Sequence, residues 1–381
     1  MTAAPNPGAP SPAPAVKMSR AGFPMPAGPV VNHPGLWRGS DFKSPADYVT
    51  PMSQVMIDDI DVAFRAAKAR GLKAPEFEKE DFPLPNCAAE IGRVLDDLET
   101  GRGFALIRGF PMERYDEDDA GILFWGIGRH FGAAVSQNAD GHLLGHVRNL
   151  DLDIKKTNVR GYQTTIELAH HNDQSDVIAL MCRKTAKSGG ESSLVSVASV
   201  HNAMLEQCPD LLAELFNPFY IDRRGELGRA DEGDAPHYAM PILSYHNGLL
   251  TMRYIRGYIH SAQRFDDVPR LTDKQVAAMD AFDALARSPG MALDFTMEPG
   301  DIQMANNYCV LHSRRSFVDN DAVADRRHML RIWLCVPNSR ELPPCFERRF
   351  GTCAPGALRG GIPPHRQQSE TLAQEFELAR L

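Results

Sequence analysis

The sequence predicts an α+β protein whose core is a β-sandwich or jelly roll flanked by helices. Apolar residues recur at helical spacing through the first third of the chain. From about residue 165 the pattern changes to short apolar segments separated by Gly, Pro, Asn or Asp, which is typical of strands. Two helical segments interrupt these strands. Helices before and between many short strands favour a layered sandwich or jelly roll.

The helices of the first third are bounded by recognisable signals. We expect helices over 53–70 and 86–100, the second beginning at Asn86 as N-cap and ending before Gly101. Acidic residues over 116–119 open another helix, because negative charge suits a helix N-terminus, and Gly132 closes it. The apolar, glycine-bounded segment 103–110 is predicted to be a strand.

The later part of the chain alternates strands with two helices. Helices are predicted over about 197–216 and 272–287, and the second begins with the capping-box pattern Thr272-Asp273-Lys274-Gln275. The predicted strands are 177–182, 194–197, 249–254, 291–297, 302–304, 308–312 and 329–336.

Composition excludes several classes of protein. The 381 residues are 43% hydrophobic and 24% charged, as in a globular protein with a sizeable core. With 41 basic and 49 acidic residues the net charge is −8, which disfavours a nucleic-acid partner. The longest apolar run, Val177–Cys182, is far shorter than the roughly 20 residues that cross a bilayer. We expect a small-molecule partner, with a homo-oligomer left open.

The cysteines indicate a reducing compartment. The chain has seven, an odd number, and none forms a C-x-x-C pair. Several lie in apolar stretches, where a free thiol behaves as a small hydrophobe. Residues 1–19 do not show a basic segment followed by an apolar one, so we do not expect them to be a secretory signal. A cytoplasmic location is therefore expected.

The chain is expected to contain one large domain. Residues 1–20 are rich in Pro and Ala and are predicted to be a disordered tail. Residues 21–340 form the predicted domain, with a helical N-terminal part and a helical insert at about 197–290. Residues 341–381 follow as a C-terminal extension.

One short motif carries candidate metal ligands. His171-Asn172-Asp173 is the single His-x-acid match in the chain. On an extended strand His171 and Asp173 point to the same face, because side chains alternate. An imidazole and a carboxylate are two of the three ligands of the 2-His-1-carboxylate triad that binds Fe(II). The motif alone is weak and needs a distant second histidine.

His312 is the best candidate for that third ligand. It ends the segment Asn306–His312, which follows a turn at Pro299-Gly300-Asp301. An isolated histidine of this kind is more often a core residue, so the sequence after it matters. There, Arg327 and Arg331 lie four apart and share one strand face with Met329. Apolar residues fill the other face, so both arginines are predicted to be partly buried, and a buried guanidinium requires an anionic partner.

The order of these motifs resembles the taurine dioxygenase (TauD/TfdA-like) family of Fe(II)/2-oxoglutarate oxygenases. The corresponding elements are His171-Asn172-Asp173, Gly189-Gly190-Glu191-Ser192, His312 and Arg327, together with Arg331 and the early strand 103–111. The resemblance covers about residues 100–336. Two positions differ from the family pattern: His170 stands where Trp is common, and Gly-Gly-Glu-Ser replaces Gly-Gly-Asp-Thr.

The resemblance implies the fold, the cofactors and the reaction. It implies a double-stranded β-helix that holds Fe(II) through His171, Asp173 and His312, and it places the distal carboxylate of 2-oxoglutarate on Arg327 with help from Ser192. The implied reaction consumes O2, converts 2-oxoglutarate to succinate and CO2, and hydroxylates a substrate C–H bond or performs a related two-electron oxidation. Because halogenating relatives lack the metal carboxylate, the presence of Asp173 argues against halogenation.

The substrate is predicted from fewer residues. In the resembled family an arginine at the position of Arg331 lies near an acidic group of the cosubstrate or the substrate, so we expect a small organic acid or amino-acid-like substrate. Tyr162, Gln163 and Thr164 are candidates for its other contacts. Residues 137–165 are polar and contain glycine, so they are a candidate closing lid; a solvated surface loop is the alternative.

Two other functions use the same residues. A zinc-dependent hydrolase could use the His and Asp ligands, but it has no use for the paired arginines. A non-catalytic jelly-roll binding module does not need a complete ligand set. Both remain open from the sequence alone.

Overall fold

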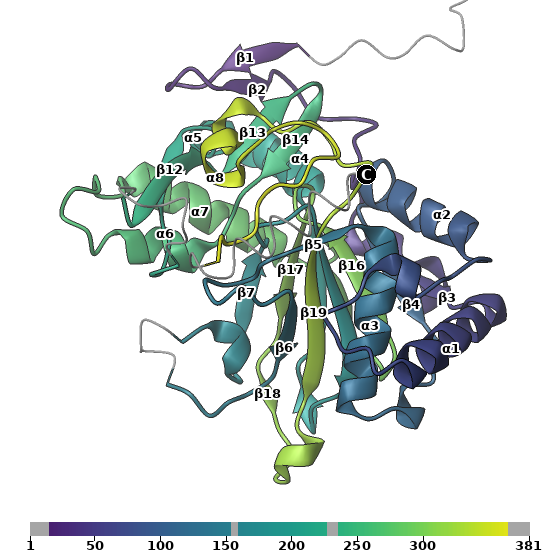
Figure 1. The fold of residues 1–381 in the computed structure, drawn as a ribbon. Helices are drawn as coiled ribbons and strands as arrows, with labels where there is room; N and C mark the ends of the chain where they lie inside the picture. The colour runs from purple at the N-terminus through teal and green to yellow at the C-terminus, as the bar shows by residue number, and fades with distance from the viewer. Residues whose placement is uncertain (1–14, 154–158, 227–234, 365–381) are drawn as a thin grey trace, which may run out of the picture.

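The core of the computed structural model, which describes residues 15–153, 159–226 and 235–364, contains two β-sheets (Figure 1). The larger sheet is antiparallel except where β3 pairs with β4. In spatial order its strands are β3 (Val49–Pro51), β4 (Phe104–Arg108), β16 (Ile302–Asn306), β8 (Val177–Lys184), β19 (His328–Cys335) and β5 (Ala133–Val135), and β6 (Leu144–Val147) also pairs with β19.

The smaller sheet is fully antiparallel and carries the two histidines of the predicted metal site. Its strands, in spatial order, are β15 (Leu293–Phe295), β10 (Ser192–Ser196), β17 (Val310–Arg314) and β7 (Leu168–His171). A short ladder joins β9 (Ser188–Gly189), which precedes β10 in the chain, to β18 (Phe317–Val318), which follows β17.

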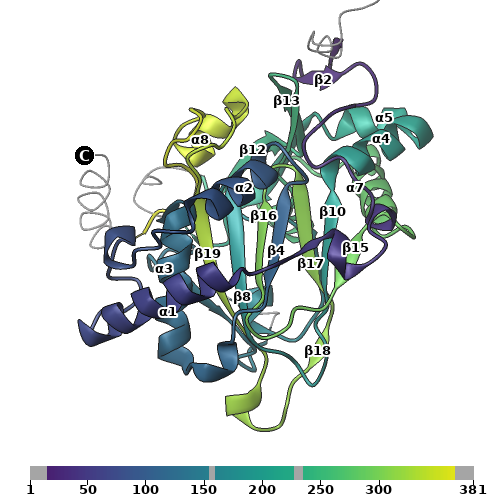
Figure 2. The same cartoon turned by 90° about the vertical axis from the view of Figure 1, so that its right-hand side faces the viewer.

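Strand alternation divides the apolar residues between two cores. On β4, Phe104 and Leu106 belong to the cluster shared with the smaller sheet, whereas Ala105 and Ile107 belong to the cluster shared with the N-terminal helices. The larger sheet is therefore covered by helices on one face and by the smaller sheet on the other, as Figure 2 also shows. These helices are α1 (Gln54–Ala69), α2 (Ala88–Glu99) and α3 (Glu117–Phe131).

The predicted N-terminal helices are confirmed, with one capping error. Ser53 caps α1 and Asp116 caps α3, each by accepting a backbone N–H. The predicted Asn86 cap of α2 is wrong: Cys87 is the N-cap and makes no side-chain cap bond. The Asn86 amide instead donates to Asp59, at 3.0 Å from Nδ2 to Oδ1.

The predicted helical insert is wrong in part, because it also contains two hairpins. The single helix expected over 197–216 is two helices, and Pro209 begins the second because proline cannot continue the first. The Thr272 capping box is confirmed. The insert elements are α4 (Val197–Gln207), α5 (Pro209–Glu214), the hairpin strands β11 (Pro218–Asp222) with β12 (His237–Pro241) and β13 (Leu243–His246) with β14 (Leu249–Met252), α6 (Arg256–Ala262) and α7 (Asp273–Ala286).

Both ends of the described chain are more ordered than the predicted tail and extension. Residues 1–14 lie outside the described residues, but β1 (Val16–Met18) pairs with β2 (Pro24–Pro26), so the predicted tail is too long. Arg20 forms an ion pair with Glu214 of the insert at 3.0 Å. The described part of the C-terminal extension includes α8 (Glu347–Phe350) and packs into the core of the insert, while residues 365–381 lie outside the description.

Short 3-10 helices connect several of these elements. They are Gly39–Asp41, Pro45–Asp47, Lys79–Asp81, Met112–Arg114, Gly161–Gln163, Val323–Asp325 and Pro344–Phe346. No described helix is long and apolar enough to cross a membrane. All seven cysteines are free thiols.

A buried ion pair fixes the chain just after the predicted metal motif. Asp176 accepts hydrogen bonds from Arg359 Nε at 2.8 Å, from the Tyr308 hydroxyl at 2.6 Å and from the backbone N–H of Val336. The Arg359 and Asp176 side chains are at most 1% exposed. The C-terminal extension thereby reaches the segment that carries Asp173.

We expect Arg359→Ala to lower the free energy of unfolding by about 3–5 kcal/mol, because it leaves the Asp176 charge buried without its cation. Urea denaturation followed by circular dichroism measures this change. Arg70→Ala is the control, because Arg70 forms an exposed pair with Asp81 and such pairs contribute less than about 1 kcal/mol. Equal destabilisation by both variants would contradict the prediction.

Candidate active site

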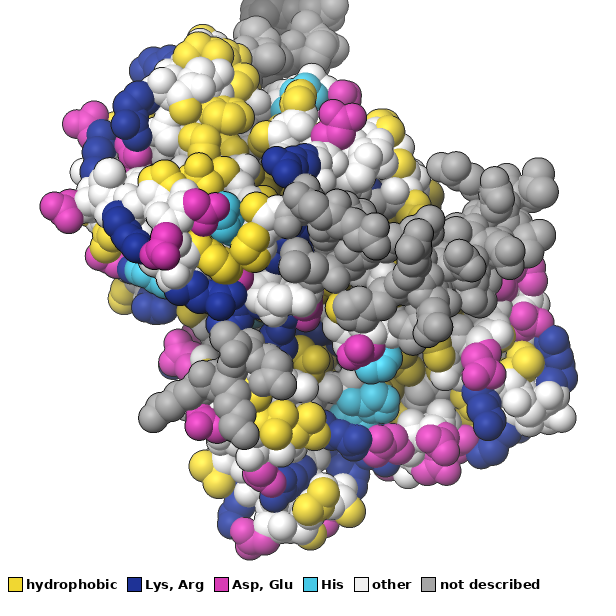
Figure 3. All heavy atoms as spheres, turned by 60° about the vertical axis from the view of Figure 1, so that its left-hand side comes forward, with side chains coloured by type: hydrophobic (Ala, Val, Ile, Leu, Met, Phe, Trp, Pro, Cys, Tyr) yellow, Lys and Arg dark blue, Asp and Glu magenta, His cyan; other side chains and the backbone are white. Residues whose placement is uncertain are grey.

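A cavity of about 330 Å³ lies where the two sheets meet the insert. Residues of the larger sheet, the smaller sheet, the insert and the C-terminal extension all line it. This volume suits a small organic ligand. On the face drawn in Figure 3, dark-blue Lys and Arg side chains and magenta Asp and Glu side chains are intermixed among the described residues.

Strand pairing brings the two predicted histidine ligands together. His171 on β7 and His312 on β17 are direct partners across the ladder, and their ring centroids lie 4.3 Å apart. His171 Nδ1 lies 2.8 Å from the carbonyl oxygen of Ala169, so this nitrogen carries the proton and donates it. Nε2 of His171 is then the nitrogen with a free lone pair, as a metal ligand requires.

Asp173 reaches the same point from beyond the end of β7, not from the strand itself as predicted. Its backbone N–H donates to Asn307 Oδ1 at 3.0 Å. The preceding Asn172 is anchored by its amide to the carbonyl oxygens of Met252 and Asn307, each at 2.6 Å. These bonds, rather than strand alternation, orient the carboxylate, which accepts a hydrogen bond from the Trp333 indole at 2.8 Å.

The three groups are in the ionisation states that metal binding requires. Burial lowers the pKa of His171 and lowers that of His312 to about 3, so both rings are neutral at pH 7. Burial opposes ionisation of Asp173, but the nearby Arg331, the two histidines and the Trp333 hydrogen bond outweigh it and lower its pKa. Two neutral imidazoles and one carboxylate result.

The donor atoms of these residues converge. One atom each from His171, Asp173 and His312 lies within 4.8 Å of the others, and His312 Nε2 is 4.0 Å from Asp173 Oδ2. Such spacings allow one ion to contact all three. Two histidines and a carboxylate on one side of an ion leave open positions for other ligands, so the residues fit Fe(II).

Arg327 lies in the same cavity, buried and only partly paired. Its side chain packs over the ring of Phe317, with 5.3 Å from Cζ to the centroid, and among the described residues Nη1 has no hydrogen-bond partner. Arg314 packs on the same ring at 4.6 Å. Burial, followed by the charge of Arg327, lowers the pKa of Arg314 to about 9. Two adjacent buried guanidinium groups favour an anion between them.

The other predicted site residues are placed as follows. Ser192 lines the cavity and lies opposite Arg314 across the β10–β17 ladder. Arg331 Nη1 is 3.6 Å from Asp173 Oδ2, and its guanidinium lies over the Tyr162 ring at 4.7 Å from the centroid.

Tyr162 lines the cavity, but Gln163 and Thr164 are not among its lining residues. The Gln163 side chain accepts the backbone N–H of Arg160, and the Thr164 hydroxyl donates to the carbonyl oxygen of Gly161. The predicted lid over 137–165 contains strand β6, and its residues 154–158 lie outside the described residues; closure stays a prediction.

Comparison with known proteins identifies the family. The model of the "Taurine catabolism dioxygenase TauD, TfdA family" matches residues 68–333, more than half of the chain. The chain belongs to the TauD/TfdA family.

Two curated relatives cover most of the chain. The FR-33289 synthase of Streptomyces rubellomurinus is 29% identical over 314 residues, covering 81% of this chain and 91% of the synthase. The taurine hydroxylase-like protein SAT17 of Stachybotrys chartarum is 27% identical and covers 79% of each chain.

Solved structures share the fold of this TauD/TfdA member. An asparagine oxygenase in complex with Fe(II), hydroxyasparagine and succinate has a TM-score of 0.59 at 13% identity, covering 75% of this chain and 93% of its own. The non-heme iron oxygenase OrfP in complex with Fe and α-ketoglutaric acid has a TM-score of 0.54 at 16% identity, with the same coverage.

Family membership confirms the predicted enzyme class. The protein is a 2-oxoglutarate-dependent non-heme iron dioxygenase, and the expected dependence on iron and 2-oxoglutarate is confirmed with it. The zinc hydrolase and the non-catalytic binding module are not supported.

Sequence reasoning missed several residues of the TauD/TfdA site. Trp333 could have been found, because it continues the alternating face of Arg327, Met329 and Arg331. Gln137, whose Oε1 accepts from Arg331 Nε at 2.6 Å, carries no local signal. Arg253 lines the cavity from the insert, and Arg314 lies two residues after His312 on the same strand face.

We expect Trp333→Phe to weaken Fe(II) binding about 10- to 100-fold, because the Asp173 carboxylate loses the donor that orients it. Anaerobic equilibrium dialysis measures this affinity. Trp125→Phe is a matched control that also removes an indole N–H, which donates to the Phe77 carbonyl within the N-terminal helical core. Unchanged iron affinity in Trp333→Phe would show that this bond does not orient Asp173.

Proposed function

We propose that His171, Asp173 and His312 bind one Fe(II) ion and that Arg327 binds the distal carboxylate of 2-oxoglutarate. The observation that carries the proposal is the presence in one cavity of a converging 2-His-1-carboxylate set and a buried guanidinium with an unpaired nitrogen among the described residues. Ser192 and Arg314, which also line that cavity, complete the anion site. In this arrangement the three ligands would hold the ion, and Arg327, Ser192 and Arg314 would hold the distal carboxylate of 2-oxoglutarate in the same cavity.

We also infer that the two sheets form a double-stranded β-helix within one domain spanning residues 21–340. Their mainly antiparallel strands share a core that includes Phe104, Leu194 and Trp333. The family match ends at residue 333, close to the proposed C-terminal boundary, and the insert is formed by the connection between β10 and β15.

The bound iron and 2-oxoglutarate together supply the oxidation, in which O2 is consumed, 2-oxoglutarate becomes succinate and CO2, and a substrate C–H bond is hydroxylated or undergoes a related two-electron oxidation. The residues of the chain bind and orient. The Trp333 indole donates a hydrogen bond to the Asp173 carboxylate, and Arg331 lies beside it. The neighbouring Asn172 side chain donates to the carbonyl oxygen of Met252 in the insert. Apolar side chains of Ile178, Leu180 and Met329 line the cavity and reduce its water content.

Anaerobic titration of the Fe(II)-loaded protein with 2-oxoglutarate tests the proposal. A visible metal-to-ligand charge-transfer band should appear and saturate at one equivalent. The His312→Ala variant should give no such band under the same conditions. A wild-type protein that gives no band at saturating 2-oxoglutarate would refute the proposed site.

The substrate is proposed to be a small organic acid or an amino-acid-like compound. Among the described residues, eight arginines and four acidic residues line the cavity, so its lining favours anionic groups. Arg331 and Tyr162 lie beside Asp173 and are the nearest candidates for contact with such a group. The structurally similar asparagine oxygenase and OrfP are described in complex with hydroxylated amino acids.

A screen for substrate-stimulated succinate formation tests this class. Acidic and amino-acid-like compounds should stimulate turnover, and uncharged apolar compounds should not. Tyr162→Ala should raise the KM for the stimulating compound about tenfold, because Arg331 loses the ring against which it stacks. The KM for 2-oxoglutarate should not change. Preference for an uncharged, apolar substrate would overturn the acidic class.

A further inference from the structure

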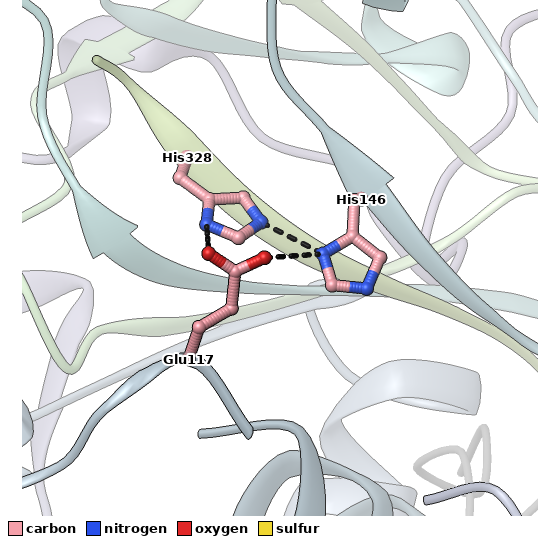
Figure 4. Close-up of side chains that lie close together, drawn as sticks. All are labelled: Glu117, His146 and His328. Atoms are coloured by element: carbon pink, nitrogen blue, oxygen red, sulfur yellow. Dashed lines mark hydrogen bonds and ion pairs between the residues drawn. The ribbon is translucent and has the colours of Figure 1, made fainter. Parts of the chain in front are cut away.

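Three potential metal ligands converge at a second point, on the other face of the larger sheet. They are Glu117 at the start of α3, His146 on β6 and His328 on β19 (Figure 4). His328 is 3% exposed, whereas the side chain of His146 is 40% exposed, so the cluster extends from the protein interior to solvent. No residue of this cluster lines the cavity of the active site.

Strand geometry explains why these residues meet. The side chains of Met329 and Arg331 on β19, and of Arg327 just before it, line the cavity. His328 and Leu330 therefore point to the opposite, helix-covered face. His146 pairs with Leu330 across the β6–β19 ladder, which makes it the diagonal neighbour of His328. Glu117 also lies over this face, because it begins α3 and α3 packs on β19.

The donor atoms lie close enough together for one ion, because one atom each from Glu117, His146 and His328 lies within 4.8 Å of the others. His146 Nδ1 is 2.9 Å from His328 Nε2, a contact that requires a proton on one of two facing nitrogens. Glu117 Oε1 is 3.6 Å from His146 Nδ1, and Glu117 Oε2 is 3.8 Å from His328 Nδ1, too long for hydrogen bonds. Because His328 faces His146 through Nε2 and Glu117 through Nδ1, only one of these nitrogens can bind an ion shared with the other two groups. Ligands bound at about 2.0–2.2 Å around a tetrahedral ion lie about 3.3–3.6 Å apart, which is within the 4.8 Å spread of the three groups.

Two arginines hold the Glu117 carboxylate in place. Arg148 Nη1 donates to Oε1 at 3.1 Å, and Arg183 Nη1 lies 3.7 Å from Oε2. Arg183 lies on this face by strand alternation, because Val177, Ala179 and Met181 of β8 face the same helix-covered core. The β8–β19 register is irregular here: His328 pairs with Lys184 and Met329 with Cys182, which leaves Arg183 unpaired in the ladder. Each carboxylate oxygen keeps a further lone pair for another ligand.

The donor set selects the type of ion. Two imidazoles and one carboxylate suit Zn²⁺ and similar borderline ions, whereas Ca²⁺ and Mg²⁺ prefer oxygen ligands. The positive charges of Arg148 and Arg183 further disfavour a weakly held hard cation.

We propose that Glu117, His146 and His328 form a second divalent-metal site, selective for Zn²⁺ or a chemically similar ion. A metal here joins the N-terminus of α3 and the edge strand β6 to β19, directly beside Arg327 in the chain. The site is independent of the proposed iron centre, because it shares no ligand with it.

Zinc titration of a variant that lacks the iron ligands tests the proposal. Tag-free His171→Ala/Asp173→Ala protein should bind one equivalent of Zn²⁺ in isothermal titration calorimetry. Adding Glu117→Gln or, separately, His146→Ala should weaken that binding at least about tenfold, because loss of even an outer partner of a metal ligand costs 10- to 100-fold. His142→Ala is the matched control, since this nearby histidine bonds to Asn138 and lies outside the cluster.

The outcomes separate this site from the proposed function. No zinc binding by the folded double variant would overturn the second site and leave the iron centre untouched. Binding that persists unchanged in Glu117→Gln or His146→Ala would also overturn it. Circular dichroism verifies the fold of every variant, and the conservative Glu117→Gln change decides the result if His146→Ala does not fold.

Discussion

Asp173→Ala protein should bind Fe(II) at least about 100-fold more weakly than the wild type, and its 2-oxoglutarate-dependent succinate formation should fall to the level measured without iron. The magnitude follows because even indirect support of a metal ligand contributes 10- to 100-fold to affinity. The carboxylate is also the single negative charge of the converging set, so its loss leaves two neutral imidazoles. Anaerobic dialysis with iron analysis and a succinate assay measure the two effects.

His171→Ala and His312→Ala should lose iron and turnover in the same way. His246→Ala is the control, because this histidine lies on β13, pairs with Glu341 and is not part of the cavity. Wild-type iron occupancy with unchanged activity in Asp173→Ala would exclude this carboxylate as a ligand. Chloride-dependent formation of a chlorinated product by the wild type would contradict the predicted hydroxylation or related oxidation.

Arg327→Ala should raise the apparent KM for 2-oxoglutarate at least about 30-fold, because truncating one partner of a buried, hydrogen-bonded charge pair costs at least about 2 kcal/mol. Ser192→Ala should raise it less than about tenfold, as expected for one neutral hydrogen bond. Steady-state kinetics at varied 2-oxoglutarate measures both values. The fold should remain intact, since the Arg327 side chain packs on Phe317 and its Nη1 makes no hydrogen bond to the described residues that the change would remove.

Arg326→Ala provides the internal control for this prediction. Arg326 is the neighbouring residue, and its guanidinium pairs with Asp151 at 2.6 Å, outside the cavity. Its replacement should leave the 2-oxoglutarate requirement unchanged. If Arg327→Ala and Arg326→Ala behaved alike, the anchor would have to be sought elsewhere, with Arg314 as the next candidate.

Much of the secondary structure could be predicted because its signals are local. The alternation of β19, the acidic start of the helix at residues 116–119 and the capping box at Thr272 all depend on neighbouring residues, and the structure confirms them. Errors arose where a distant contact competed with a local signal. Asn86 is a good capping residue by type, but its side chain bonds to Asp59 on α1 instead.

The candidate site shows the same difference between local signals, which could be predicted, and distant contacts, which could not. The order of His171, Asp173, His312 and Arg327 along the chain could be read directly, and that order led to the family. The manner in which Asp173 reaches the histidines could not, because it depends on Asn172 bonding to Met252 and Asn307, which are 80 and 135 residues away. Gln163 and Thr164 were expected in the cavity, yet their side chains satisfy local backbone groups instead.

By itself, the sequence determined the chemical inventory and much of the local structure: the residue types, their spacing, the strand faces and the positions of most helices. Tertiary structure alone decided which groups meet. It paired His171 with His312 across two strands, set Arg314 beside Arg327 and brought Glu117, His146 and His328 together on the opposite face. The physical reason is that periodicity and capping act within a few residues, whereas strand register and layer packing join segments separated by more than a hundred.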